Sequence, residues 1–206
     1  MRVLISVVAV MAMVAGCSGP SNPRPPDSPP PASSAAPVPT SRGPAPVVSR
    51  TLDLTSHLAN PCDLLTTQDF VSLGFAGNYV VIPPYRDAVE PELACEVGGG
   101  DIRVETGGGT LHLRLNPHTS LLGQAYADSP RTYPFFEPTE VDGFPAVRRS
   151  FYEDWMGGMC EVVVATGPSQ GLKVQHSPSA SAGHGVKGNC DRLMPIVAEV
   201  MTRLGA

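Results

Sequence analysis

Residues 162–176 read VVVATGPSQGLKVQH, an apolar run, a Gly-x-Ser-x-Gly string and a second run. This stretch decides the fold, because the string is also found at the nucleophile elbow of serine hydrolases, where a strand of a parallel sheet turns into a helix. Here the residues after Gly171 alternate between apolar and polar side chains, which is typical of a strand. Pro168 and Gly171 favour a tight turn. The stretch therefore predicts an antiparallel hairpin with Ser169 at its tip, and it disfavours a hydrolase fold.

The same alternation predicts further strands along the chain. They lie between glycine clusters or beside the turn pair Asp142-Gly143. The predicted strands cover residues 95–97, 101–106, 110–116, 145–152, 159–166 and 172–176. In the third of these strands, Leu111, Leu113 and Leu115 share one face, which indicates that this face packs on a core.

Two short helices are predicted before the last part of the chain. Thr66 begins a Thr-x-x-Asp sequence, which is typical of a capped helix start, and Gly74 is expected to end that helix. Residues 119–127, after Asn116-Pro117, form the second candidate.

The last helix has the clearest apolar face. We expect Asn189 to cap it, Leu204 to end it, and Pro195 to lie near its first turn or to bend it. The residues of the apolar face recur at helical spacing: Leu193, Ile196, Val197, Val200 and Leu204. The fold class is therefore predicted as α+β, a mainly antiparallel sheet with a short N-terminal helix and a C-terminal helix packed on it.

The N-terminus has the features of an exported protein. Arg2 is followed by a run of about a dozen apolar residues, too short to span a bilayer, and residues 1–16 are predicted to be a signal peptide that is removed. The sequence Val14-Ala15-Gly16-Cys17 resembles the lipobox of bacterial lipoproteins, which implies that Cys17 becomes an acylated N-terminus carrying fatty acids such as palmitate. The alternative is an ordinary secretory cleavage site that happens to precede a cysteine.

The next segment differs from the rest in composition. Eleven of the 32 residues from Ser18 to Ser49 are proline, and few are large and apolar. Such a segment buries too little surface to offset the entropy of ordering it, so we predict that residues 17–49 form a lipidated, disordered tether. Residues 50–206 have the length of one globular α+β domain.

The predicted domain is acidic. It has eleven Lys and Arg against eighteen Asp and Glu, a net charge near −7, and no run of basic residues. This balance repels polyanions and argues against nucleic acid as a partner.

Four cysteines fall within residues 50–206, and an even number in an exported domain favours disulfides. Cys62 and Cys190 each resemble the start of a helix, whereas Cys95 and Cys160 lie in strand-like runs. Each half of the domain thus has one cysteine of each kind, so we predict the bonds Cys62–Cys95 and Cys160–Cys190. A zinc site is the alternative, but the chain has no Cys-x-x-Cys pair and its histidines are scattered, so no metal is predicted.

Residues 183–188, GHGVKG, match the Gly-x-Gly-x-x-Gly pattern of dinucleotide-binding proteins. That fingerprint requires a following parallel strand and an acidic residue about 20 positions later, and the printed sequence does not supply them. We therefore predict a flexible loop here, and no cofactor.

Four aromatic residues are candidates for contact with a partner or ligand: Tyr133, Phe135, Phe136 and Trp155. The first three lie between prolines in TYPFFEP and could line a groove, or they could form an edge segment that covers the core. Trp155 is the chain's one tryptophan and could be an exposed recognition tip, or part of a hairpin loop packed on the domain.

The ordered set of cysteines and their neighbours resembles a family of actinobacterial lipoproteins with a domain of unknown function (DUF3558-type). The segments that carry the resemblance are Asn60–Leu65 with Leu73-Gly74, Cys95, Val141–Ala146, Cys160 and Asn189–Asp191. The resemblance covers nearly all of residues 50–206. It implies an envelope protein on the outer face of the cytoplasmic membrane, and it supplies no catalytic residues.

These observations favour a membrane-anchored, non-enzymatic binding or interaction module, whose partner is an unknown envelope protein. The alternative is a carrier of a lipid or another small apolar ligand, which needs an internal cavity. A serine hydrolase that uses Ser169 with His176, His184 and Asp191 is disfavoured, because the strand and helix order of that architecture is missing.

Overall fold

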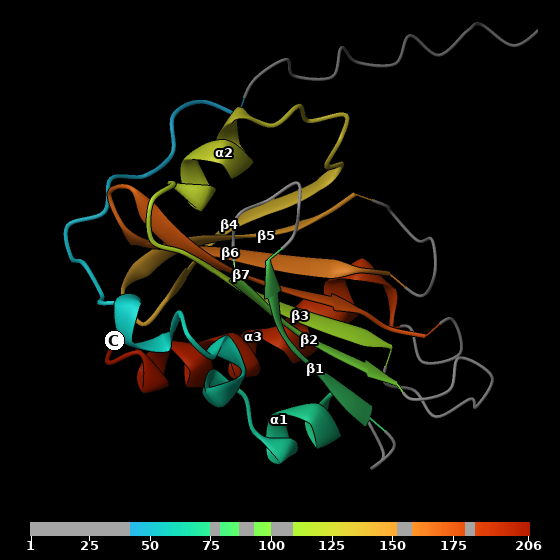
Figure 1. Ribbon diagram of the computed structural model, residues 1–206. Coiled ribbons are helices and arrows are strands. Elements are labelled where there is room, and N and C mark those ends of the chain that lie inside the picture. The colour runs from blue at the N-terminus through green and yellow to red at the C-terminus, as the bar shows by residue number, and fades with distance from the viewer. Residues whose placement is uncertain (1–41, 75–78, 87–92, 100–108, 152–157, 180–183) are drawn as a thin grey trace, which may run out of the picture. The chain divides into compact units, whose positions relative to one another are not determined.

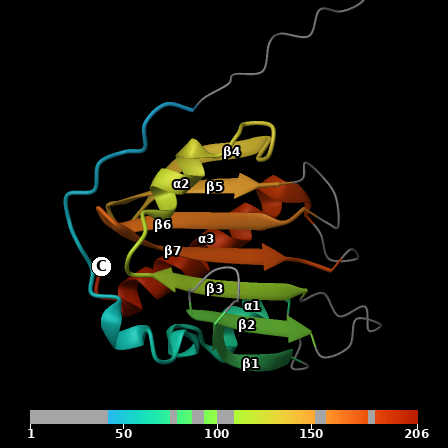
Figure 2. The same cartoon turned by 45° about the horizontal axis from the view of Figure 1, so that its top comes forward.

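The computed structural model describes residues 42–74, 79–86, 93–99, 109–151, 158–179 and 184–206. Within these ranges the chain forms a seven-stranded sheet in the order β1-β2-β3-β7-β6-β5-β4, and every neighbouring pair is antiparallel (Figure 2). The strands are β1 (Tyr79–Arg86), β2 (Leu93–Gly99), β3 (Thr110–Asn116), β4 (Phe135–Val141), β5 (Phe144–Ser150), β6 (Cys160–Gly167) and β7 (Gln170–Ser177). The predicted α+β class is confirmed. The predicted strand at residues 101–106 lies outside the described residues.

Two tight turns connect neighbouring strands, one at the centre of the sheet and one at its edge. Gly167 pairs with Gln170, so β6 and β7 form the predicted antiparallel hairpin, and Ser169 lies exposed at its tip. Asp142 and Gly143 both have positive φ angles, 51° and 78°, and connect β4 to β5. Both central residues of a type I′ hairpin turn need positive φ, which is why Asp-Gly is favoured there.

Both edge strands contain proline. In β1 the register shifts between Ile82 and Tyr85, where Pro83 and Pro84 lie, and β4 contains Pro138. Proline has no N–H for a neighbouring strand, so within a strand it is tolerated mainly at sheet edges, near the strand's start or at bulges, and at an edge it resists pairing with other chains. Sequence analysis did not predict β1, because the Pro-Pro pair interrupts its alternation.

The helices are α1 (Thr67–Ser72), α2 (Leu121–Ala127) and α3 (Gly185–Arg203), with the 3-10 turns η1 (Thr55–His57) and η2 (Pro61–Leu64). The cap predicted for the first helix is present. The Thr66 hydroxyl accepts a hydrogen bond from the Asp69 amide, and the Asp69 carboxylate accepts one from the Thr66 amide at 2.6 Å. The same carboxylate accepts from Arg203 at the end of α3, at 2.8 Å. Asp69 thus joins α1 to the C-terminal helix.

Helix α3 begins earlier than the sequence predicted. Its first residue is Gly185 and His184 lies at the N-cap, so the cap at Asn189 and the flexible loop through Gly188 are both wrong. Asn189 is instead fully buried; its amide donates to the Gly158 carbonyl, and its oxygen accepts from the His184 amide at 3.4 Å. Tertiary contact outweighs the low helix propensity of the two glycines. Pro195 therefore lies inside the helix, on its exposed side.

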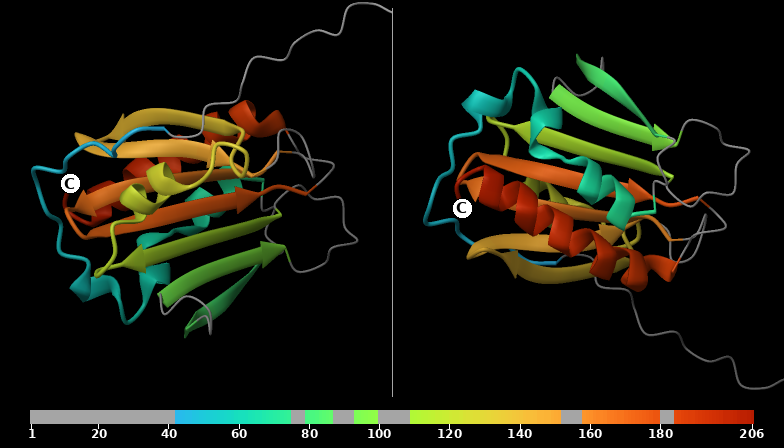
Figure 3. Two further views of the ribbon diagram at one scale, coloured as in Figure 1. Left: turned by 90° about the horizontal axis from the view of Figure 1, so that it is seen from above. Right: turned by 90° about the horizontal axis from the view of Figure 1, so that it is seen from below.

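The sheet has two faces, each covered by different helices (Figures 1 and 3). The first face carries α3 together with η1, η2 and α1, and it buries Leu111, Leu113 and Leu115 as predicted. The apolar side of α3 packs here through Leu193, Ile196, Val197, Val200 and Leu204. The second face carries α2, which packs on Val147, Val163 and Ala165. Strand β6 is buried on both faces, which explains its nearly continuous apolar sequence.

Residues 42–54 run along the domain before η1. The Leu52 amide donates to the Thr166 carbonyl at 2.8 Å, and Leu54 is buried in the core of the first face. Nearer the N-terminus, Arg42 also contacts the domain, so the folded part of the described chain includes residues that we had assigned to the tether.

Candidate binding surface

Both predicted disulfides are present. Cys62 in η2 is bonded to Cys95 in β2, and Cys160 in β6 is bonded to Cys190 in α3, with Cα–Cα distances of 5.1 and 5.2 Å. The bonds fasten one helical element to each half of the sheet, on the first face. They close loops of 33 and 30 residues, lengths at which a crosslink strongly restricts the unfolded chain.

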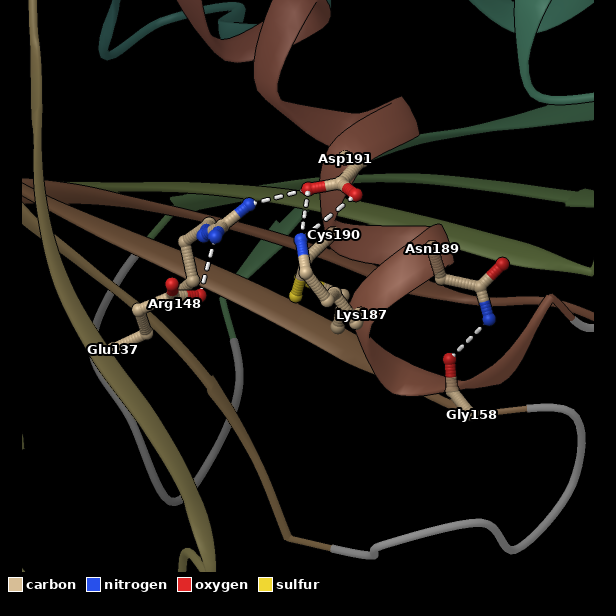
Figure 4. Close-up of a disulfide and its surroundings, with 8 residues drawn as sticks. Glu137, Arg148, Gly158, Lys187, Asn189, Cys190 and Asp191 are labelled. Carbon is tan, nitrogen blue, oxygen red and sulfur yellow. Dashed lines mark hydrogen bonds and ion pairs between the residues drawn. A yellow bond between two sulfur atoms is a disulfide. The ribbon is translucent and has the colours of Figure 1, made fainter.

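Charged side chains surround the second disulfide at the surface (Figure 4). Arg148 in β5 forms ion pairs with Glu137 in β4 and with Asp191 in α3, the latter at 2.6 Å. Hydrogen bonds from Arg148 and then from Lys187 lower the pKa of Asp191. Because Asp191 is exposed, these pairs orient the helix more than they stabilise the fold.

The predicted aromatic contact residues do not form one cluster. Tyr133 is buried beside the second face, and Phe136 lies on that face, where it meets Tyr126 of α2 edge-on at 5.1 Å between ring centroids. Phe135, one position earlier in β4, points to the opposite side and packs against the core of the first face. TYPFFEP thus forms part of an edge strand. The ring of Phe136 contacts α2, and the ring of Tyr133 contacts Arg149 of β5. Trp155 lies outside the described residues.

A buried ion network lies on the second face, between α2 and the sheet. Arg149 in β5 is directly opposite Glu161 in β6, and the two side chains form an ion pair although they are 7% and 1% exposed. Arg149 also binds the carboxylate of Asp128, the C-cap of α2, at 2.6 Å. The Nζ atom of Lys173 in β7 is 4.0 Å from the other Glu161 oxygen.

An aromatic ring completes this network. The Arg149 guanidinium lies 3.9 Å from the centroid of the Tyr133 ring, and Tyr133 in turn contacts the ring of Phe151 at 4.1 Å. Burial, and then the nearby charge of Glu161, raises the pKa of Tyr133. Burial by itself lowers the pKa of Arg149, but Glu161, Tyr133 and Asp128 outweigh it and raise that pKa overall. Tyr133 therefore stays neutral and Arg149 stays charged.

Arg42 binds at the end of the same network. Its guanidinium donates to the main-chain carbonyls of Asp128 and of Tyr133, the latter at 2.6 Å, and it stacks 4.1 Å from the centroid of the Phe136 ring. Burial, and then the charge of Arg149, lowers the pKa of Arg42. We call the two carbonyl oxygens and this ring the arginine site.

An apolar hollow of about 320 Å³ lies beside α2. Its lining comes from the N-terminal segment, α2, β6 and the β6–β7 turn: Ala45, Pro46, Val47, Val48, Ser120, Leu122, Ala165 and Pro168. It is at the lower end of the size range of small-molecule sites.

The residues of the candidate serine triad are separated. Ser169 precedes the first residue of β7, whereas His176 is buried near the last residue, on the face where Cys160 lies opposite it. At about 3.3 Å per strand residue, the two lie roughly 20 Å apart. Asp191 is held by Arg148 and Lys187.

The described ranges contain no group of three or more His, Cys, Asp or Glu side chains that could hold a metal ion. No helix in those ranges is long and apolar enough to cross a bilayer.

Sequence analysis missed Arg149, Glu161 and Arg42. The sequence does contain a signal for Glu161. Residues 160–167 are mostly apolar at both odd and even positions, which indicates a strand buried on both faces. A glutamate inside such a strand has to be buried and paired. Arg149 is the residue that pairs with it through the register of β5 and β6, which the sequence alone did not define.

The family model described as "Protein of unknown function (DUF3558)" matches residues 12–203, nearly the whole chain. No curated protein and no solved structure matches the chain. The match includes both disulfides, the sheet and α3, and the chain therefore belongs to the DUF3558 family.

Proposed function

We propose that this protein is a membrane-anchored lipoprotein of the cell envelope whose domain is a non-enzymatic binding module. The anchor would be acyl chains on Cys17, on the outer side of the cytoplasmic membrane. Two disulfides support an oxidising location, because such bonds persist outside the cytosol. The actinobacterial origin suggested by the sequence is part of the same proposal.

One observation carries the binding role. On the second face, charged and aromatic side chains from α2, β4, β5, β6 and the N-terminal segment meet in one network, which is buried at Arg149 and Glu161 and reaches the surface at Asp128, 40% exposed. Arginine, lysine and tyrosine at such a place bind carbonyl, carboxylate and ring groups. The carboxylates in the network, Glu161 and Asp128, are already held by Arg149, which favours recognition over proton transfer.

Crosslinking in intact cells tests this role. Phe151 is 37% exposed and contacts Tyr133, whereas Val71 is 50% exposed on α1. A photo-crosslinking amino acid at Phe151 is expected to capture a specific envelope protein, and the same group at Val71 is the matched control. Equal labelling at both positions, or none at Phe151, would contradict a binding role for the second face.

A carrier of a lipid or other small apolar ligand is the second candidate, and the hollow beside α2 is the observation that favours it. Organic extraction of the purified protein, followed by mass spectrometry, separates the two. A lipid that copurifies in stoichiometric amount favours the carrier, whereas a captured protein without lipid favours the interaction module.

A further inference from the structure

The arginine site binds a guanidinium through three groups that are part of the folded domain. The carbonyls of Asp128 and Tyr133 accept its hydrogen bonds, and the ring of Phe136 covers one side of it. Planar stacking with directed hydrogen bonds fits arginine better than lysine, whose ammonium is a compact point charge. The structure thus defines the chemical class of the group that this site binds.

The present occupant belongs to a segment that is held mainly by apolar contacts: Ala45 and Val48 pack against the core of the second face, and Val48 also packs against the core of the first face. Residues 43–49 have no regular structure, and Pro44 and Pro46 cannot donate backbone hydrogen bonds. Val47 is 91% exposed. Gly43, directly after Arg42, has a φ of 79°, a conformation that glycine adopts without strain.

The next polar side-chain attachment follows eight residues after Arg42, at Arg50. Arg50 donates to the Asp142 carbonyl at 2.5 Å, and Leu52 is buried and bonded to Thr166. Residues 43–49 belong to no strand, so release of this segment would expose the apolar surface under Ala45 and Val48 and leave the strand pairing intact.

The surroundings of Arg42 act on its positive charge in opposite directions. Burial, and then the positive charge of Arg149, disfavour the charged form of Arg42 and lower its pKa, while the carboxylate of Asp128 favours the charged form. The remainder of the domain is acidic, so a cationic segment from another molecule is attracted to it.

We propose that the arginine site is the docking point for an arginine-bearing segment of a partner protein, and that Arg42 occupies it in cis as a replaceable latch. Exchange of Arg42 for the partner's arginine frees the chain as far as Arg50, which lengthens the tether by about 25 Å at roughly 3.1 Å per residue. This inference rests on the proposed binding function and names the chemistry of the partner.

The latch is tested first, by the distance between nitroxide labels on V47C and S169C. In the wild-type background we expect one narrow distance distribution, and in Arg42→Gln a broad one shifted to longer distances. Arg131→Gln is the matched control, because Arg131 is exposed in the loop that supplies the two carbonyls and carries the same charge as Arg42. An unchanged distribution in Arg42→Gln, with both disulfides formed, would overturn the latch.

The site is tested next, with N-acetyl-arginine amide as the probe and the citrulline and lysine analogues as controls. In Arg42→Gln, the amide resonances of Tyr133 and Phe136 are expected to shift saturably with the arginine probe. In the wild-type protein the apparent affinity is expected to be about tenfold weaker, because the cis arginine competes at an effective concentration in the millimolar range.

Three outcomes would refute the docking site: no saturable shift in Arg42→Gln, equal affinity for the citrulline analogue, or equal affinity in the wild type and the variant. If any of them occurs while Phe151 still captures a partner in cells, this inference fails and the proposed binding function stands. If the probe binds but Phe151 captures nothing, the proposed binding function fails for the Phe151 surface and the arginine site stands.

Discussion

Replacing Cys160 and Cys190 together by alanine is expected to lower the free energy of unfolding by about 3.6 kcal/mol, the chain-entropy value for a loop of 30 residues. Both residues are fully buried, and their bond holds α3 on β6. For a domain of this size, such a loss lowers the midpoint of thermal unfolding by roughly 7 to 14 °C. Thermal unfolding followed by circular dichroism measures the change.

The matched variant is Cys62→Ala with Cys95→Ala, which opens a loop of 33 residues and is expected to cost about the same. The effects of the two changes are expected to add, because the bonds lie in different halves of the sheet. Strong reductant should reproduce the loss in the wild-type protein. A wild-type midpoint that reductant does not move would show that the bonds do not stabilise the domain.

The second large effect is expected from Glu161→Gln. This change removes the negative charge that pairs with buried Arg149. Removal of one partner of a buried ion pair lowers the free energy of unfolding by about 3 to 5 kcal/mol. Asp128 still binds Arg149 from the surface, so we expect the lower end of that range. Denaturant unfolding with both disulfides intact gives the value.

Glu137→Gln is the control for this measurement. Glu137 pairs with Arg148, the residue next to Arg149, but its side chain is 46% exposed, so the expected cost is below about 1 kcal/mol. Arg149→Met combined with Glu161→Leu should recover much of the stability, because neither charge then remains buried alone. Equal costs for the two glutamine variants would contradict the assignment of a buried network.

Local sequence signals predicted much of the fold. The β6–β7 hairpin, the Asp142-Gly143 turn and the Thr66 cap depend on neighbouring residues and are present as predicted. The disulfide pairing was also correct, because each half of the domain brings one helical and one strand cysteine together.

Features set by distant contacts were not predictable in this way. The start of α3 at Gly185 depends on the burial of Asn189 against Gly158, 31 positions away. The pairing of Arg149 with Glu161 depends on strand register, since a shift of one residue would turn either side chain to the opposite face.

The position of Arg42 illustrates the same limit. Composition places it in a proline-rich segment that buries too little surface to fold alone, and the sequence therefore predicts a disordered tether. Its docking depends on two carbonyls and a ring that only the folded domain brings together. The aromatic residues of TYPFFEP do not form one group, because alternation along β4 turns Phe135 to the first face and Phe136 to the second.

The central claim is that this chain is an acylated anchor joined to a disulfide-bonded binding domain. Intact mass spectrometry of the protein extracted from cell membranes in detergent tests it most directly. The account predicts a chain that begins at Cys17, carries the mass of a diacylglycerol and a further acyl group, and lacks four hydrogens for its two disulfides. A mature chain without acyl mass that is released into the medium, or one with four free thiols, would contradict it.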